Sequence, residues 1–142
     1  MGLSDTLINQ RAQMGKNVIL IAGILSIAAA SMGLAEPPRF TAQVQRITDG
    51  DTFRMYELEP AIRIWGLDAP ETDEAGGSAA THALKDLIAG QTLTCVIKDV
   101  DRYSRIVGQC RLEDDRDIAA EMIRLGVATE YCRYSEGYYG TC

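Results

Sequence analysis

Histidine is almost absent from this chain, which has one histidine, one tryptophan and four prolines among its 142 residues. A site that needs a pair of histidines is therefore excluded. Basic residues are also outnumbered, since 14 Lys and Arg stand against 20 Asp and Glu and the net charge is −6. A chain with this balance has no general attraction for polyanions, so any anion must be bound locally by a few convergent side chains.

The first 35 residues differ in composition from the rest. Two basic residues precede a 13-residue apolar run from Val18 to Ala30, and small residues end the segment at Ala35. This order predicts a secretory signal peptide at residues 1–35, because a membrane span needs about 20 apolar residues. An uncleaved membrane anchor is the alternative, and Met14 is an alternative start. Cleavage would leave one domain, residues 36–142, whose net charge is −7 because the leader carries +1.

All four cysteines lie in residues 36–142. An even number of cysteines in a short exported chain favours disulfides over free buried thiols, which are the alternative. Residues 91–98 and 105–112 are typical of a hairpin, and a symmetric register about its turn brings one cysteine of each strand within disulfide reach. The sequence therefore predicts two disulfides, Cys95–Cys110 and Cys132–Cys142.

The apolar pattern predicts a mainly β domain. Strands are expected at residues 41–47, 52–56, 61–67, 92–98 and 105–112. Residues 78–89 and 117–125 instead have apolar side chains at helical spacing, and each stretch is followed by a glycine. Five strands with two helices indicate an α+β fold built on a five-stranded Greek-key barrel of the OB type.

Two carboxylates are expected to meet at one end of this barrel. If the second and third strands pair as a hairpin, Asp51 at the start of one lies beside Asp68 at the end of the other. Carboxylate oxygens are the ligands that hard cations such as Ca²⁺ prefer, and no histidine or cysteine stands near. Turn acids in a surface ion pair are the alternative interpretation.

An arginine and a third acid accompany this pair. Gly66 permits the twist that would turn Arg63 and Asp68 towards the same side. Pro70 stops the strand and leaves Glu71 on a loop near the carboxylates, where it could orient or deprotonate a water molecule. The pattern predicts a cation site beside a phosphate clamp.

Three blocks of the sequence resemble the signature motifs of the staphylococcal nuclease (thermonuclease) family. They stand in the family's order, and the similarity runs from about Ala42 to Arg133: Ile47–Thr52, Arg63–Glu71 and Asp101–Arg105. The resemblance implies the same OB fold. It also implies a Ca²⁺-dependent endonuclease or phosphodiesterase that hydrolyses DNA and RNA and leaves 3′-phosphate ends.

The resemblance implies a role for individual residues. The Ca²⁺ ligands would be the carboxylates of Asp51 and Asp68 and the backbone carbonyl of Ala69, where the family usually has threonine. The catalytic residues would be Arg63 and Arg105, which contact the phosphate, and Glu71, which orients or activates water.

A substrate pocket is expected beside these residues. Tyr103, next to Arg102, is placed to stack on a base, because aromatic faces bind bases of any sequence. Tyr131 and Tyr134 would form the other side, although the stretch Tyr131–Tyr134 departs from the family pattern. The expected substrates are DNA and RNA, preferably single-stranded.

The sequence therefore predicts a periplasmic or secreted nuclease that acts as a monomer, without stable membrane association after cleavage of the leader. An exported OB-fold module that binds nucleic acid or another ligand without cleaving it is the alternative. The acidic surface and Ala69 favour that alternative, whereas the complete set of acids and arginines favours the enzyme.

Overall fold

A computed structural model of the protein describes Gly33 and residues 35–142. The signal peptide predicted for residues 1–35 lies almost entirely outside the described residues. Within the described part, no helix is both long enough and apolar enough to cross a membrane.

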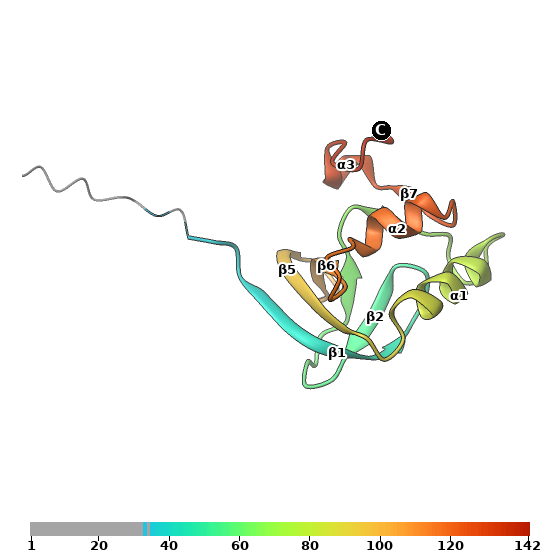
Figure 1. Ribbon diagram of the computed structural model, residues 1–142. Coiled ribbons are helices and arrows are strands. Elements are labelled where there is room, and N and C mark those ends of the chain that lie inside the picture. Colours follow the sequence, from blue (N-terminus) through green and yellow to red (C-terminus); the bar gives the residue numbers. More distant parts are fainter. Residues whose placement is uncertain (1–32, 34) are drawn as a thin grey trace, which may run out of the picture. The chain divides into compact units, whose positions relative to one another are not determined.

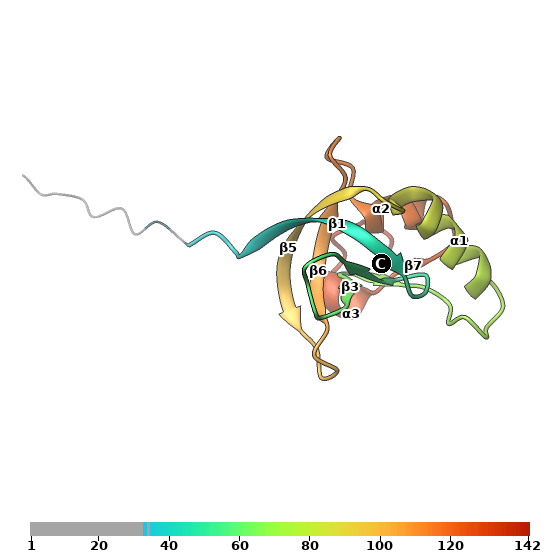
Figure 2. The same ribbon diagram turned by 90° about the horizontal axis from the view of Figure 1, so that it is seen from below.

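Five strands close into a barrel, as Figures 1 and 2 show from two directions. Around the barrel the order is β1, β2, β3, β6, β5, with these bounds: β1 Arg39–Ile47, β2 Thr52–Met55, β3 Ile62–Ile64, β5 Thr92–Val100 and β6 Ile106–Arg111. β3 and β6 pair in parallel, and the other neighbours are antiparallel. The predicted five-stranded, mainly β barrel is confirmed.

The strand predicted at 61–67 is in fact two strands. Gly66 has a φ of 70°, a left-handed conformation that glycine adopts without strain. The chain turns there, leaves the barrel after Ile64 and enters β4, Leu67–Asp68. β4 pairs with β7, Thr129–Glu130, a strand that the sequence pattern did not reveal. The turn at Gly66 therefore connects the barrel to the C-terminal residues through the β4–β7 pair.

In residues 35–142, three helices accompany the barrel instead of the two predicted. α1, Gly77–Ile88, packs against β1 and α2, and α2, Ile118–Arg124, lies across one end of the barrel in Figure 1. The side chain of Asp117 caps α2 by accepting a hydrogen bond from the N–H of Ala120 at 3.2 Å. The third helix, α3, Cys132–Ser135, is a single turn near the C-terminus, too short to give a periodic signal.

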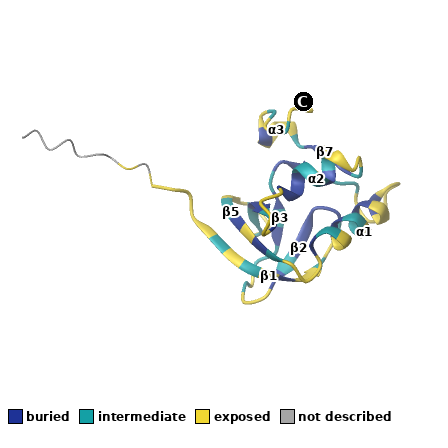
Figure 3. Ribbon diagram, in the orientation of Figure 1, coloured by how far each residue is buried: buried dark blue, intermediate teal, exposed yellow. Residues whose placement is uncertain are grey.

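The core fills the barrel and the inner faces of α1 and α2, where Figure 3 shows the buried residues concentrated. Cys95 and Cys110 lie opposite each other on β5 and β6 within this core and form a disulfide. Cys132 and Cys142 form the second disulfide, outside the barrel. The predicted pairing is confirmed, free thiols are excluded, and two disulfides indicate an oxidising compartment.

Candidate active site

The start of β2 and the end of β3 place one carboxylate against one guanidinium. Asp51 is 5% exposed, and its Oδ1 forms an ion pair with Nη1 of Arg63. Arg63 stands opposite Thr52 in the β2–β3 register, and Asp51 directly precedes Thr52 at the start of β2. Nη2 of Arg63 lies 3.7 Å from Oδ1 of Asp68 and donates a hydrogen bond to the carbonyl of Leu67 at 3.3 Å.

A second arginine reaches the same carboxylate through a threonine. Arg105 donates from Nη1 to Oγ1 of Thr52 at 3.4 Å, and that hydroxyl donates to Oδ1 of Asp51 at 2.9 Å. Both arginines therefore converge on Asp51, one directly and one across a single hydroxyl group.

The loop between β5 and β6 aims Arg105 at this point. Asp101 accepts hydrogen bonds from the N–H groups of Tyr103 and Arg105 and from Nε of Arg105 at 2.7 to 3.0 Å. Burial pushes the pKa of Asp101 upwards, but the hydrogen bonds from Arg105 and Tyr103 outweigh it and lower that pKa below its ordinary value. The charged carboxylate thus locks the loop in a shape that holds Arg105 inward and leaves Tyr103 exposed.

The acids at this end suit a hard cation. Asp51 and Asp68 lie on either side of the guanidinium of Arg63, so both carboxylates already face one cationic position. Oδ2 of Asp51 accepts a hydrogen bond from the N–H of Ala69 at 3.3 Å, which brings the Ala69 peptide to the same place. Burial and the neighbouring Asp51 carboxylate raise the pKa of Asp49, as expected where acids crowd together. Among the described residues no group of three or more His, Cys, Asp or Glu forms a metal cluster, so a cation here would depend on two carboxylates and backbone oxygen.

Glu71 lies on the loop that leads into α1. Its N–H donates to the carboxylate of Glu74 at 2.8 Å, and its carbonyl accepts from the N–H of Glu74 at 2.9 Å. A Cβ at Gly77 would lie 1.8 Å from the Glu71 carbonyl oxygen, so α1 must begin with a glycine for the loop to pack there. The Glu71 side chain is exposed and lines a hollow of about 800 Å³ together with Asp68 and Ala69.

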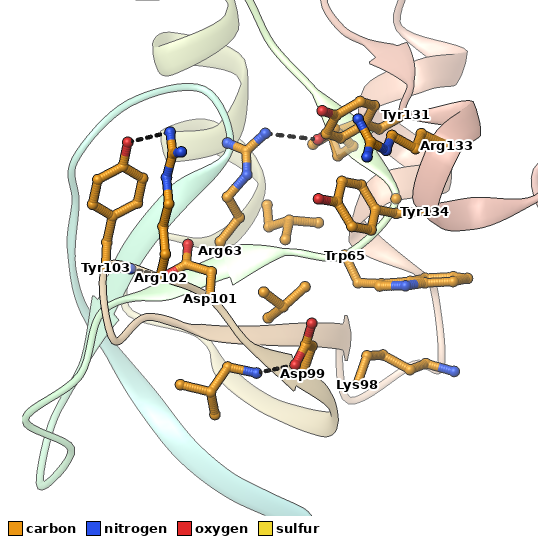
Figure 4. Close-up of a pocket in the computed structure, with 15 residues that line it drawn as sticks. Arg63, Trp65, Lys98, Asp99, Asp101, Arg102, Tyr103, Tyr131, Arg133 and Tyr134 are labelled. Carbon is orange, nitrogen blue, oxygen red and sulfur yellow. Dashed lines mark hydrogen bonds between the residues drawn. The ribbon is translucent and has the colours of Figure 1, made fainter.

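A separate cavity of about 710 Å³ opens on the other side of Arg63. In Figure 4, Arg102 and Tyr103 stand on one side of it, Arg63 lies in the middle, and the opposite wall is formed by Tyr131, Arg133 and Tyr134. The rings of Tyr131 and Tyr134 are 4.8 Å apart in an edge-to-face arrangement. Four basic and two acidic side chains line the cavity, which makes it locally positive in an acidic protein: Arg63, Lys98, Arg102, Arg133, Asp99 and Asp101.

The residues singled out in the sequence fall into three neighbouring groups. Arg63 connects the three groups, because it contacts both Asp51 and Asp68 and also lines the 710 Å³ cavity. One group surrounds Asp51, the second lines the hollow at Glu71, and the third lines the cavity: Arg102, Tyr103, Tyr131 and Tyr134. The structure thus places Glu71 in a different depression from the tyrosines.

Sequence reasoning missed several residues of the cavity. Trp65 lines the cavity and packs against Tyr138 and Tyr139, with ring centroids 5.3 and 6.0 Å away. Arg133 and Lys98 carried no signal of their own. Glu130 could have been found, because a lone acid in the run Val127–Tyr131 has to be exposed or specifically bound.

Comparisons with known proteins identify the family to which the chain is similar. The family described as "Staphylococcal nuclease homologue" matches residues 61–141, more than half of the chain. That region contains Arg63, Asp68, Glu71 and Arg105, whereas Asp51 precedes it.

Named relatives match similar stretches. An "Uncharacterized endonuclease" of Escherichia coli is 37% identical over 95 residues, which are 66% of this chain and 62% of that protein. A "Micrococcal nuclease" of Shigella flexneri is 37% identical over 93 residues, 62% of this chain and 53% of that protein. "Protein ParB" of Escherichia coli is 31% identical over 120 residues, 78% of this chain and 66% of that protein. The chain spans less than two thirds of the length of these relatives. From the family match and the barrel, the chain belongs to the staphylococcal nuclease family.

Proposed function

We propose that this protein is an exported, Ca²⁺-dependent phosphodiesterase that cleaves DNA and RNA, with a preference for single strands. The observation that carries the proposal is the convergence of Arg63, directly, and Arg105, through Thr52, on the buried carboxylate of Asp51. Two arginines fixed at one acidic point can hold the oxygens of a single phosphate when a cation occupies the carboxylates.

The oxygen ligands for Ca²⁺ would be the carboxylates of Asp51 and Asp68 and the carbonyl of Ala69. Threonine is usual in the family at position 69, and alanine still supplies the backbone oxygen that such a site needs. When bound, the cation would neutralise the carboxylates and polarise a phosphate oxygen.

Glu71 accepts the proton of the attacking water in this proposal. As the water oxygen bonds to phosphorus, the bond from phosphorus to the 5′-oxygen breaks, and the 5′-oxygen takes a proton from solvent water and leaves as a 5′-hydroxyl group. A 3′-phosphate therefore remains on the other product. Arg63 and Arg105 stabilise the negative charge that develops on the phosphoryl oxygens, a contribution that is usually the largest single one in such reactions. Glu71 is exposed and carried by a loop, so its side chain can turn from its hollow towards the phosphate held by Arg63.

The cavity at Arg63 would receive the nucleotide next to the scissile phosphate. Tyr103 on one side and Tyr134 on the other are each more than half exposed, so bases can reach both rings. The guanidinium groups of Arg102 and Arg105 lie over the Tyr103 ring, 4.7 and 5.4 Å from its centroid, so a base would stack on the part of this ring that they leave open. Bases are available for stacking in single strands and are paired inside a duplex, which accounts for the expected preference. The basic side chains of the cavity offset the acidity of the rest of the surface.

The two disulfides fit a periplasmic or secreted protein, exported by the signal peptide predicted for residues 1–35. After cleavage of that leader the domain is expected to act as a monomer.

Product analysis tests the proposed reaction. A 5′-labelled single-stranded oligonucleotide is incubated with the oxidised protein and Ca²⁺, and the products are treated with a phosphatase that removes 3′-phosphates. A mobility shift of the labelled fragments after phosphatase treatment is expected. Fragments that already end in 3′-hydroxyl groups would contradict the proposed direction of attack, and an intact oligonucleotide that is nonetheless bound would indicate the non-catalytic module instead.

A further inference from the structure

The C-terminal segment, residues 129–142, is organised around a buried carboxylate. Glu130 is 7% exposed and accepts four hydrogen bonds from three residues of this segment. The donors are Oγ of Ser135 at 2.6 Å, N–H of Tyr139 at 2.9 Å, N–H of Thr141 at 2.8 Å and Oγ1 of Thr141 at 2.9 Å. Burial alone would raise the pKa of Glu130, but these hydrogen bonds lower it to about 2.

Covalent and hydrogen-bonded contacts close the segment around that carboxylate. The disulfide between Cys132 and Cys142 joins the start of α3 to the end of the chain's described part, over a loop of 10 residues. The hydroxyl of Tyr139 donates to Oδ1 of Asp117 at 3.1 Å, and Asp117 also caps α2. The segment is thus anchored to the barrel domain through α2 as well as through the β4–β7 pair.

The same segment supplies one wall of the cavity at Arg63. Tyr131 donates its N–H to the carbonyl of Gly66 at 2.8 Å, beside the turn where the chain leaves the barrel. Tyr131, Arg133 and Tyr134 face the cavity from α3 and its cap, opposite Arg102 and Tyr103 in Figure 4. Because α3 is only one turn long, it cannot hold its own orientation and depends on the contacts of Glu130.

We propose that Glu130 and the Cys132–Cys142 disulfide are positioning elements for substrate binding, which fix the wall of Tyr131, Arg133 and Tyr134 against the cavity without touching the reacting phosphate. The inference rests on the proposed function for its kinetic readout. Loss of either element should loosen the wall and weaken the binding of a single-stranded oligonucleotide, while Asp51, Arg63 and Arg105 keep their places in the barrel.

The only tryptophan of the chain reports directly on this docking. Trp65 lines the cavity and packs edge-to-face against Tyr138 at 5.3 Å, with the ammonium of Lys98 4.6 Å from its ring centroid. Quenching of its fluorescence by acrylamide should therefore increase when the C-terminal segment loosens. This measurement needs no substrate and no activity.

The test compares Glu130→Gln and the double variant Cys132→Ser, Cys142→Ser with the oxidised parent protein. Glu130→Gln replaces an acceptor oxygen by an amide donor that faces N–H and O–H groups, so it should disrupt the hydrogen bonds. Both variants should raise KM for a short single-stranded oligonucleotide by about tenfold, the size expected when one base–aromatic stack is lost. The kcat should stay within about twofold, because the barrel residues that act on the phosphate are unchanged. Trp65 quenching should rise in parallel.

Two controls separate positioning from general destabilisation. Glu136→Gln makes the same chemical change at an exposed site six residues along the segment and should leave KM and quenching unchanged. Val44→Ala creates a cavity in the barrel core, lowers the melting temperature and should also leave KM unchanged. If Glu130→Gln fails to fold, Thr141→Val removes one side-chain donor to Glu130 and keeps the backbone N–H, and a smaller rise in KM is expected.

The outcomes of the two proposals can be told apart. A fall in kcat at unchanged KM, or a KM unchanged in both the Glu130→Gln and the double-serine variants, overturns the positioning role. If the parent protein shows no cleavage, the proposed function fails, and oligonucleotide affinity and Trp65 quenching in excess chelator still decide the inference: equal affinity and quenching in parent and variants would overturn it.

Discussion

The two walls of the cavity are built in different ways. On the barrel side, Arg63 lines the cavity from β3 and pairs with Asp51. Arg105, at the end of the loop between β5 and β6, lies outside the cavity lining and pairs with Asp101. On the other side, Tyr131 and Tyr134 stand on a single helical turn that depends on the contacts of residues 129–142. The barrel side holds groups that must meet a developing charge, and the C-terminal side holds aromatic groups that are expected to contact bases.

Because of this difference, we expect substitutions on the two sides to change different kinetic constants. Changes on the barrel side should lower kcat, because its groups act on the charge that appears in the transition state. Changes on the C-terminal side should raise KM, because its groups contact bases equally before and during the reaction.

The largest effect is expected at Arg105. Arg105→Ala should reduce kcat by about a thousandfold, the range seen when one preorganised charge-stabilising group is removed. Single-turnover cleavage of an oligonucleotide measures the chemical step. Arg124→Ala is the matched control, because this arginine is exposed at the end of α2 and pairs with Glu121. Parent-like turnover of Arg105→Ala would remove this residue from the mechanism.

A smaller loss of kcat is expected at Glu71. Glu71→Gln keeps the shape of the side chain but cannot accept a proton, so kcat should fall by about a hundredfold or more, as for the loss of a general base. Asp73→Asn changes another exposed acid of the same loop and should have no effect. A Glu71→Gln enzyme with the parent's rate would show that a different group accepts the proton.

A tyrosine on the C-terminal wall is expected to affect KM and not kcat. Tyr134→Ala should raise KM by about tenfold with little change in kcat, since one stacking surface is lost. Steady-state kinetics with single-stranded oligonucleotides gives both constants. Tyr56→Ala, at an exposed tyrosine outside this cavity, serves as control. An unchanged KM together with a lower kcat would contradict the division between the two walls.

The smallest effect is the acid sensitivity of the C-terminal segment. The pKa of Glu130 is lowered from 4.5 to about 2 in the folded protein. A carboxyl group whose pKa is lower in the folded protein than in the unfolded chain stabilises the fold at pH values above its unfolded pKa. This contribution is lost as the pH falls through the folded pKa. Trp65 quenching should therefore rise between pH 4.5 and 2, and this change should be absent from Glu130→Gln. Identical pH profiles for the two proteins would show that Glu130 does not control docking.

The barrel side could be predicted from the sequence because its signals are local. The pairing of adjacent strands predicts that Asp51 lies beside Asp68. In the structure the same two strands pair with Thr52 opposite Arg63, and Asp51 forms its ion pair with Arg63. The Cys95–Cys110 pair follows from the same kind of argument about hairpin register. In each case a period of two and a short turn fix which side chains meet.

The C-terminal side could not be predicted in this way. α3 is too short for a helical period, and β7 is two residues long. Their positions depend on Glu130, whose partners Ser135, Tyr139 and Thr141 are held by non-periodic hydrogen bonds. The position of Glu71 was also only partly predictable. The sequence indicated that Glu71 lies near the carboxylates, but it could not give the loop geometry that directs this side chain to a separate hollow.

The most direct test of the whole account is the release of acid-soluble nucleotides from denatured DNA by the oxidised protein, with Ca²⁺ or with excess chelator, in parallel with Glu71→Gln. Release that requires Ca²⁺ and falls about a hundredfold in the variant is the predicted result. A folded, disulfide-bonded protein that releases no nucleotides with any divalent ion would contradict the nuclease, and equal release with Ca²⁺ and with chelator would contradict the cation site at Asp51 and Asp68.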